Sequence, residues 1–387
     1  MQALLYCCCG VDVHENMIEA CILKGESDNP KILHRQFKTL QDDLISFTLW
    51  LYENECYHIA MESTGVYWRP VYEAIETYSH YVESVIVTNA YEMRNLPGRK
   101  TDIKDAEWIA TLLRHGLLRH SFIPEKNIRN LREASRLYKK MVAEKSRFSN
   151  RIEKLLQAHG FKLSSVLSDI LCKSGRNILN VLADRGSLTA TDISQCLKGK
   201  TKCSAEEIHS AVSGELNEYE RQMLKLLLRR ITTLDEDIVS VLDIMASMAQ
   251  PYTVQLSQID SVIGIDRKAA LLILAEISAS PQDNFSTSER LCSWAGLSPR
   301  NDESAGKVKS RKILPGNPYI KSILCQVAWV AASNRKNNFG QWFWSHQGKM
   351  GKKKAIVAVS RKILTTIYVL LRDGTFYDPV VALSHIR

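Results

Sequence analysis

The sequence predicts a chain of three parts: an α/β domain built on a mixed sheet, an α-helical coiled-coil middle, and a mostly α-helical C-terminal domain. Three observations predict this order. Short apolar runs alternate with amphipathic stretches in the first third, two long heptad stripes occupy the middle, and basic helical segments occupy the last third. The chain has 387 residues, of which 45% are apolar and 24% charged. This composition is ordinary for a folded protein and excludes wholesale disorder, collagen-like repeats and a membrane bundle.

Residues 1–124 are expected to form the α/β domain. Two apolar runs separated by a turn-prone segment predict an antiparallel pair of strands, and a third strand follows. Beyond them, strand-like runs alternate with segments of helical spacing. The predicted strands cover residues 4–13, 16–23, 31–37, 57–61 and 81–87, and the predicted helices cover residues 40–51, 65–77 and 102–115. Thr101 is a suitable N-cap for the last of these helices.

Residues 125–250 carry two apolar stripes whose members recur at alternating steps of three and four residues. One stripe runs from Leu131 to Leu155 and the other from Leu224 to Met245, with Lys145 alone inside the first. Stripes of this length favour an antiparallel coiled-coil hairpin, or dimerisation arm, over two amphipathic helices packed on a globular core. The weakly patterned residues 160–215 are expected to cap the tip of this hairpin.

Residues 251–387 are expected to form a basic, mostly helical domain. Residues 259–277 read as a helix, a tight turn at Gly264 and a second helix, and such a hairpin can direct backbone N–H groups at a phosphate. An ordinary corner between two helices has the same pattern. Residues 293–321 are rich in loops, and helices are predicted over residues 319–333 and 355–371.

The net charge of +9 is concentrated in this last domain. Residues 251–387 hold 19 basic and 9 acidic residues, whereas residues 1–250 are close to neutral. A basic module of this kind predicts contact with a polyanion, although solvated basic faces without nucleic acid are common. The residues expected to contact nucleic acid are Arg267, Lys268, Lys307, Lys309, Arg311, Lys312, Lys352, Lys353 and Lys354.

Basic residues are also interleaved with aromatic ones between residues 335 and 354. Arg335, Lys336 and Lys349 flank Phe339 and the run of aromatic residues at 342–344. This pattern suits phosphate contacts combined with base stacking. Aromatic anchors of a small helical core are an equally good interpretation of residues 342–344.

The ten cysteines contain no C-x-x-C pair, and the three at residues 7–9 would alternate faces in a strand. This spacing suits neither a disulfide framework nor a tetrahedral metal site. No charged leader with a cleavage site precedes them. We therefore expect free thiols in a reducing cytoplasm.

Four carboxylates are placed where they could form one site. Asp12 ends the first apolar strand, Glu62 follows the strand at residues 57–61, and Asp102 and Asp105 share one face of a predicted helix. An oxygen-rich cluster of this kind suits Mg²⁺ or Mn²⁺, and two such ions can assist phosphoryl transfer. Taken singly, each residue is also in a common place for an acid.

These motifs resemble those of the DEDD transposases of the insertion-sequence 110/1111 family. Residues 10–14, 61–65 and 100–106 resemble the family's D, E and D-x-x-D motifs, and residues 263–277 resemble its helix-hairpin-helix stretch. Residues 294–300 with 303–307 resemble its "GL-x-P…S-x-G-K" signature, which residues 316–319 and 351–355 continue. The resemblance covers nearly the whole chain in the family's order.

The resemblance implies a site-specific DNA recombinase whose first domain has a RuvC-like, RNase H fold. It implies that Asp12, Glu62, Asp102 and Asp105 bind Mg²⁺ (or Mn²⁺) and that Ser304 becomes covalently linked to DNA. A serine hydroxyl needs activation, for which basic residues just downstream are available. Ser298 and Ser310 are the alternative nucleophiles. Since Ser304 and Asp12 lie in separate predicted domains, a composite site is expected, formed by domain docking or across a dimer.

The implied partners are double-stranded target and donor DNA, a non-coding guide RNA, and a second or further copies of the chain in a homodimer or homotetramer. No membrane partner is expected. The resemblance implies a protein of the prokaryotic cytoplasm that is at the nucleoid when it is bound to DNA. Two other functions fit the residues: a RuvC-like structure-selective nuclease that uses water as nucleophile, and a non-catalytic coiled-coil DNA-binding protein.

Overall fold

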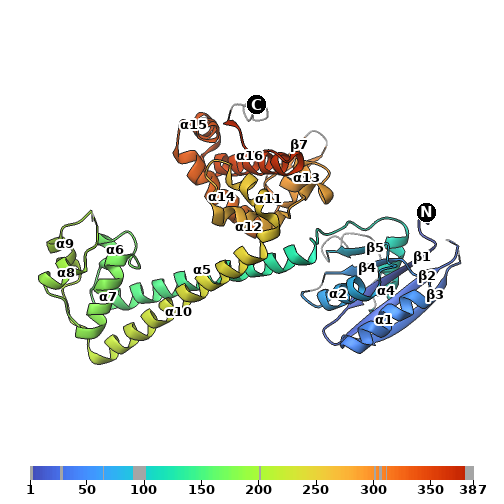
Figure 1. Cartoon of the computed structure of the whole chain (residues 1–387), viewed down its shortest axis with the longest axis horizontal. Coiled ribbons are helices and arrows are strands. Elements are labelled where there is room, and N and C mark those ends of the chain that lie inside the picture. Colours follow the sequence, from blue (N-terminus) through green and yellow to red (C-terminus); the bar gives the residue numbers. More distant parts are fainter. Residues whose placement is uncertain are drawn as a thin grey trace. The chain divides into compact units, whose positions relative to one another are not determined.

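The computed structural model describes residues 3–26, 29–63, 65–89, 102–199, 202–299, 302–304, 307–310 and 312–379. For residues 102–104, 302–304 and 307–309 it describes the backbone and not the side chains. The chain divides into two compact units, residues 1–123 and residues 124–387 (Figure 1).

The first unit is built on a five-stranded mixed sheet with the strand order β3-β2-β1-β4-β5. β2 is antiparallel to β1 and β3, whereas β4 is parallel to β1 and β5. The strands are β1 Cys7–Val13, β2 Met17–Lys24, β3 Lys31–Lys38, β4 His58–Glu62 and β5 Ser84–Thr88. Each corresponds to a predicted strand, and the mixed sheet is compatible with the expected RNase H-like fold.

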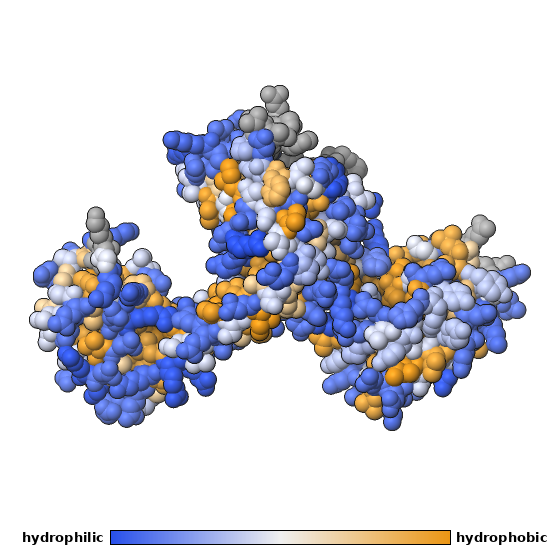
Figure 2. All heavy atoms as spheres, in the orientation of Figure 1, coloured by the Kyte–Doolittle hydropathy of each residue, from blue (hydrophilic) through white to orange (hydrophobic). Residues whose placement is uncertain are grey.

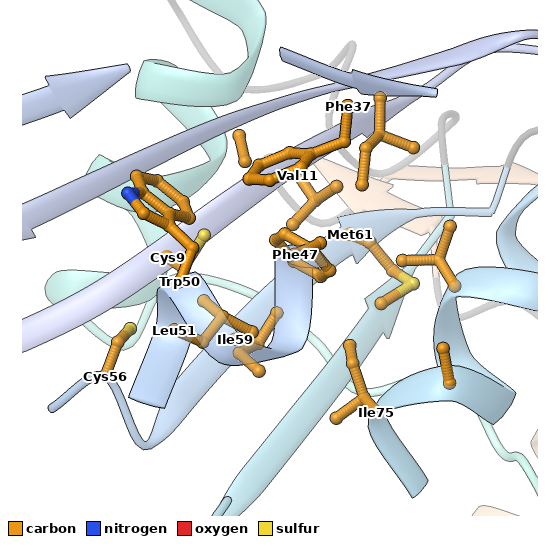
Figure 3. Packing of buried hydrophobic residues seen from close by; sticks show 14 of the residues in the cluster. Cys9, Val11, Phe37, Phe47, Trp50, Leu51, Cys56, Ile59, Met61 and Ile75 are labelled. Carbon is orange, nitrogen blue, oxygen red and sulfur yellow. The ribbon is translucent and has the colours of Figure 1, made fainter. Parts of the chain in front are cut away.

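Helices cover both faces of this sheet. α1 Gln41–Glu53 and α2 Trp68–Tyr78 lie on one face, and α4 Asp102–Arg114 packs on the other. On the first face, the rings of Phe37 and Phe47 meet edge to face with centroids 5.3 Å apart, and Trp50 lies 5.6 Å from Phe37. Figure 3 shows Val11 and Met61 of the sheet within the same cluster. A continuous apolar core therefore holds β1 and β4 in place.

Two long helices, α5 Lys126–Ala158 and α10 Glu218–Met248, lie side by side in the second unit (Figure 1). They run in opposite directions because the chain turns back through the segment between them. The buried residues of α5 include Leu131, Tyr138 and Ile152, and those of α10 include Leu224 and Ile231, all members of the predicted stripes. The coiled-coil supercoil and the dimerisation role stay predictions.

Four short helices form the segment at the far end of this pair. Their apolar residues pack around the fully buried Phe161, together with the ends of α5 and α10. Thr189 and Ser204 start two of them with capping boxes. The helices are α6 Leu163–Val166, α7 Lys173–Arg185, α8 Ala190–Cys196 and α9 Ala205–Ala211. The sequence indicates a cap here but not these helices, because most of them are too short to produce a periodic pattern.

Lys145, the lone lysine of the first stripe, has a partner on the facing helix. Its Nζ lies 2.5 Å from Asp235 Oδ1 of α10, and Arg176 Nη2 of α7 lies 2.5 Å from Asp235 Oδ2. Partial burial alone would raise the pKa of Asp235, but hydrogen bonds from Lys145 and Arg176 lower it below its ordinary value. One carboxylate thus joins α10 to both α5 and the cap.

Replacing Asp235 with asparagine is expected to destabilise the second unit more at neutral pH than at low pH. A carboxylate whose folded-state pKa is lowered stabilises the fold above its ordinary pKa of about 3.9 and loses this effect as the pH falls through the folded-state value. Urea unfolding of wild type and Asp235→Asn at pH 7 and at pH 3 measures the difference. Glu236→Gln, at an exposed neighbouring position, is the control. An equal loss at both pH values would contradict the ion-pair assignment.

The rest of the second unit is mostly helical, with one small hairpin of two strands. The helices predicted over residues 319–333 and 355–371 are present as α14 and α16, whereas α13 and α15 were not predicted. The elements are α11 Thr253–Asp260, α12 Arg267–Ile277, α13 Ser288–Trp294, β6 Asp302–Ser304, β7 Lys307–Ser310, α14 Pro318–Ser333, α15 Asn338–Met350 and α16 Lys352–Asp373, with 3₁₀ turns at Gln250–Tyr252 and Pro281–Asp283. Within the described part of the chain, no helix has the length and apolar character that crossing a bilayer requires.

Candidate active site and nucleic-acid surface

Asp12 and Glu62 lie at the ends of neighbouring parallel strands. In the register of β1 against β4, they follow directly after the last paired positions. Cys8 and Ala60, which precede them by four and two residues, pack in a cluster with residues of α4. Because side chains alternate across a strand, Asp12 and Glu62 are directed to the same face of the sheet as α4. Two of the four predicted carboxylates therefore share one face and one edge.

The first turn of α4, which contains Asp102 and Asp105, lies near this edge because α4 contacts β1 closely. A Cβ atom added at Gly10 would lie 2.1 Å from Ala106 O and 2.3 Å from Ala110 N, so the backbones of strand and helix touch here. The helix starts one turn before Ala106, which brings its first turn beside the end of β1. Asp105 is half-buried in that turn, and Asp102 begins the helix.

Glu19 is an acid beside Asp12 that the sequence analysis missed. It lies on β2 directly opposite Asp12, and it is 9% exposed. Gln36, opposite Glu19 on β3, donates a hydrogen bond from Nε2 to Glu19 Oε1. Asp12 has a further neighbour, His14, whose Nε2 lies 3.2 Å from Asp12 Oδ2. The turn after β1 could have revealed Glu19, because it fixes which residues of an antiparallel hairpin face each other.

The donor types at this edge fit a hard cation, because carboxylate oxygens are the ligands that Mg²⁺ and Mn²⁺ prefer. Among the described residues, however, no three His, Cys, Asp or Glu side chains form a group that could hold a metal ion. The side chain of Asp102 is outside the described set. The structure thus brings together the elements that carry Asp12, Glu62 and Asp105, and metal binding by the four carboxylates stays a prediction.

Ser304 lies at the end of β6 in a small hairpin. In the backbone register Ser304 pairs with Lys307 of β7, and the side chains of both lie outside the described residues. At the base of the hairpin, Pro299 and Ile313 form a β-bridge. The hairpin had not been predicted, because residues 293–321 read as loop. The nucleophilic role of Ser304 stays a prediction.

The two alternative serines have different surroundings. Ser310, at the end of β7, accepts a hydrogen bond from Lys312 N at 3.2 Å. Ser298 lies just before the hairpin, and its Oγ is buried without a hydrogen-bond partner among the described residues. Among the described residues, neither serine has a hydrogen bond to a base that could activate it as a nucleophile.

The hairpin is anchored by a buried carboxylate, Glu276 of α12, which is 0% exposed. Arg136 of α5 donates to both of its oxygens, each at 3.0 Å, and Arg132 Nη2 donates to its backbone carbonyl at 2.8 Å. Asn317 Nδ2 donates to Glu276 Oε2 at 2.7 Å, while Asn317 N donates to Trp294 O at 3.1 Å across the base of the hairpin. Glu276 therefore links α5, α12 and the segment at the base of the hairpin through hydrogen bonds.

The turn between α11 and α12 packs inward at Gly264. This residue has φ 91°, and a Cβ atom there would lie 3.0 Å from Ala331 N of α14. Asp266 caps α12, its Oδ1 accepting from Ala269 N at 2.7 Å. A carboxylate thus already occupies the helix N-terminus at which the pattern suggested a phosphate. Phosphate binding by this hairpin stays a prediction.

The predicted nucleic-acid contacts divide into exposed side chains and residues outside the described set. Arg267 and Lys268 are exposed in the first turn of α12, and burial and the charge of Lys268 lower the pKa of Lys139 on α5. Lys312 is exposed, and so are the three lysines that begin α16, Lys352, Lys353 and Lys354. The side chains of Lys307 and Lys309, and the whole of Arg311, lie outside the described residues.

The three aromatic residues at positions 342–344 differ in burial and in contacts. Phe343 is 3% exposed and belongs to the core, as does Phe339 at 0%. Trp342 is half-buried and stacks on His346, with ring centroids 4.2 Å apart. Trp344 is exposed, and its Nε1 donates to Ala332 O at 3.0 Å. The interpretation as core anchors is therefore confirmed for Phe343, whereas base stacking by the other two rings stays a prediction.

Two family models match the chain in the order of its parts. A model of DEDD transposases of the IS110 type, described as "Transposase", matches residues 9–160. A model described as "Transposase IS116/IS110/IS902 family" matches residues 256–342. The first match contains Asp12, Glu62 and α4, and the second contains Glu276 and the hairpin of Ser304.

Curated relatives match the chain over almost its full length. They include the pilin gene-inverting proteins of Moraxella lacunata and Moraxella bovis, each 21% identical over 379 residues, which is 95% of this chain and 97% of the relative. The two family models match residues 9–160 and 256–342, and the curated relatives match almost the whole chain. The chain therefore belongs to the IS110 family of transposases.

Proposed function

We propose that this transposase cuts and rejoins double-stranded DNA through a covalent serine–DNA intermediate. Ser304 is the proposed nucleophile, and Asp12, Glu62, Asp102 and Asp105 are the proposed ligands of Mg²⁺ or Mn²⁺. The observation that carries the proposal is the convergence of Asp12, Glu62 and the first turn of α4 on one face of the sheet. Because the chain belongs to a transposase family, acids that converge in this way are candidates for metal ligands, whereas isolated surface acids are not.

The chain's own groups have distinct tasks in this reaction. A bound divalent ion supplies positive charge that stabilises the negative charge developing on the phosphate. The Ser304 hydroxyl attacks phosphorus, gives up its proton to a base and displaces the oxygen of the leaving strand. Lys307, Lys309, Arg311 and Lys312 follow Ser304 in the sequence and supply positive charge next to the scissile phosphate.

In this proposal, the exposed basic residues of the second unit bind the phosphates of the DNA backbone. Arg267 and Lys268 at the start of α12 and the three lysines at the start of α16 are available for phosphate contacts. Lysines at a helix N-terminus are unfavourable by themselves, because the positive end of the helix dipole repels them. A phosphate bound there relieves this repulsion.

The proposal includes further copies of the chain and an RNA. Leu137 and Val142 of α5 and Val239 and Ile244 of α10 are exposed apolar residues, and Figure 2 shows hydrophobic residues gathered along this stretch. They support a homodimer or homotetramer that packs through the helix pair. We include a non-coding guide RNA because of the family resemblance alone. Extraction and sequencing of RNA from the purified protein test for it.

Ser304→Ala is expected to abolish the covalent protein–DNA adduct. Labelled substrate DNA is incubated with Mg²⁺ and the protein, and the products are separated on a denaturing gel, on which an adduct migrates with the protein. Because no other group can replace the attacking oxygen, the adduct should fall below detection, at least about 1000-fold. Ser310→Ala in the same hairpin is the matched control, and Asp12→Asn tests the carboxylates.

The same gel separates the alternative functions. DNA cleavage that survives Ser304→Ala and yields no adduct would favour a RuvC-like nuclease that uses water. DNA binding without any Mg²⁺-dependent cleavage by the wild type would favour a non-catalytic binder. An adduct that disappears in Ser310→Ala, and not in Ser304→Ala, would move the nucleophile to Ser310.

A further inference from the structure

Two of the seven tryptophans, Trp329 of α14 and Trp344 of α15, stand out because they are exposed, at 49% and 38%. Burial of so large a ring normally stabilises a fold, so exposed tryptophans near each other call for a ligand. Both are fixed in place by the core beneath them. Both meet Phe343 edge to face, Trp329 with ring centroids 5.8 Å apart and Trp344 with ring centroids 5.6 Å apart.

Positive charge accompanies these rings. The guanidinium carbon of Arg335 lies 3.8 Å from the centroid of Trp344, and Lys336 is exposed next to it. Val330, beside Trp329, is 60% exposed. We call these five residues, Trp329, Val330, Arg335, Lys336 and Trp344, the tryptophan patch. It lies at the corner where α14 ends and α15 begins.

The two helices that carry the patch, α14 and α15, contain no acid. From residue 318 to residue 372 the sequence contains ten Lys and Arg residues and no Asp or Glu. Among the described residues, no ion pair involves Arg335 or Lys336. A ligand with a flat aromatic face and a negative charge would therefore satisfy both features of the patch, and a nucleotide has both.

We propose that the tryptophan patch binds an unpaired stretch of a DNA strand. Its bases stack on Trp329 and Trp344, and its phosphates contact Arg335 and Lys336. The strand must be unpaired, because the faces of bases in a duplex are covered by their neighbours. The choice of DNA rests on the proposed function, in which strands leave their complements when two duplexes exchange ends.

Fluorescence anisotropy with the full-length protein tests this inference. The probes are a labelled 12-nucleotide oligothymidine, a labelled duplex and a labelled oligouridine of equal length. Trp329→Leu keeps an apolar contact with Phe343 and removes the aromatic face, so oligothymidine binding should weaken roughly 5- to 100-fold. Duplex binding should change less than about 2-fold, since phosphate contacts dominate it. Trp329→Phe should retain most of the affinity, and Tyr219→Ala, at a 70% exposed aromatic residue of α10, is the matched control.

Two further measurements distinguish base stacking from phosphate contacts. A strand with abasic sites keeps its phosphates and has no bases, so wild type and Trp329→Leu should bind it equally. Arg335→Ala should lower the slope of log Kd against log salt by about 1, whereas Trp329→Leu should leave the slope unchanged.

Several results would overturn the inference. Full oligothymidine affinity in Trp329→Leu, with a melting temperature equal to that of wild type, would exclude stacking. Oligouridine binding more than 10-fold tighter than oligothymidine binding would replace DNA by RNA as the occupant. Affinity unchanged in the tryptophan variants for every probe, with loss of self-association instead, would make the patch a protein interface. Adduct formation by Ser304 is measured on the same preparations, so failure of the proposed function is recognised separately.

Discussion

Replacement of Gly10 by alanine is expected to lower the free energy of unfolding of the first unit by about 3 kcal/mol and to slow Mg²⁺-dependent DNA cleavage by about 100-fold. The added Cβ would lie 2.1 Å from Ala106 O and 2.3 Å from Ala110 N. Both are backbone atoms of α4, so the whole helix must move away from β1. This movement carries Asp105 away from Asp12, and misplacement by about 1 Å at a reacting centre is enough for such a loss.

Urea unfolding and the adduct gel measure the two effects of this substitution. Gly348→Ala is the matched control, because Gly348 lies within α15 and a Cβ there meets nothing within 4 Å. That variant should be neutral or slightly more stable, since alanine favours a helix. Wild-type stability together with wild-type cleavage in Gly10→Ala would show that α4 does not rest directly on β1.

Glu276→Ala is expected to destabilise the second unit by about 2–3 kcal/mol. It removes the acceptor shared by Arg136 and Asn317 and leaves the Arg136 guanidinium without its bidentate partner. Buried hydrogen-bond donors lose their acceptor, which costs free energy, but the Arg136 side chain is 34% exposed and water compensates part of its charge. Urea unfolding measures the loss, and Glu289→Ala, at an exposed acid in the first turn of α13, should cost less than about 1 kcal/mol.

A double-mutant cycle separates the ion pair from the general effect of truncation. Glu276→Ala and Arg136→Ala remove the same interaction, so their combined loss should be smaller than the sum of the single losses by about 1–3 kcal/mol. Because Asn317 lies at the base of the hairpin, Glu276→Ala should also slow adduct formation at protein concentrations where DNA binding is saturated. Additive losses, or a loss no greater than that of Glu289→Ala, would contradict the anchoring role.

The architecture of the first unit was predictable because its signals are local. The apolar runs and the turn after β1 lie within about 25 residues, and Asp12 and Glu62 could be assigned to strand ends from position alone. The contact between Gly10 and α4 could not be predicted, since it joins residues about 100 positions apart. Glu19 was missed for a related reason: an acid in an apolar strand acquires meaning only from the register that places it opposite Asp12.

The second unit shows where sequence patterns stop being informative. α15 has only Phe339 and Phe343 in its core and carries two glycines, so its apolar period is weak. Residues 342–344 point in directions about 100° apart on the helix, and only tertiary packing determines which of the three rings is buried. Glu276 reads as one acid in an apolar helix, and its partner Arg136 is 140 residues away.

The absence of acids from residue 318 to residue 372 links nucleic-acid binding to folding. Charges of one sign on three packed helices repel one another, and this repulsion opposes the compact state. Any polyanion that binds the folded surface, and not the unfolded chain, stabilises the fold by mass action, and the stabilisation grows with the logarithm of its concentration above Kd. The second unit is therefore most resistant to unfolding when it carries its nucleic acid, and the amount of intact protein in a cell becomes coupled to the nucleic acid available to it.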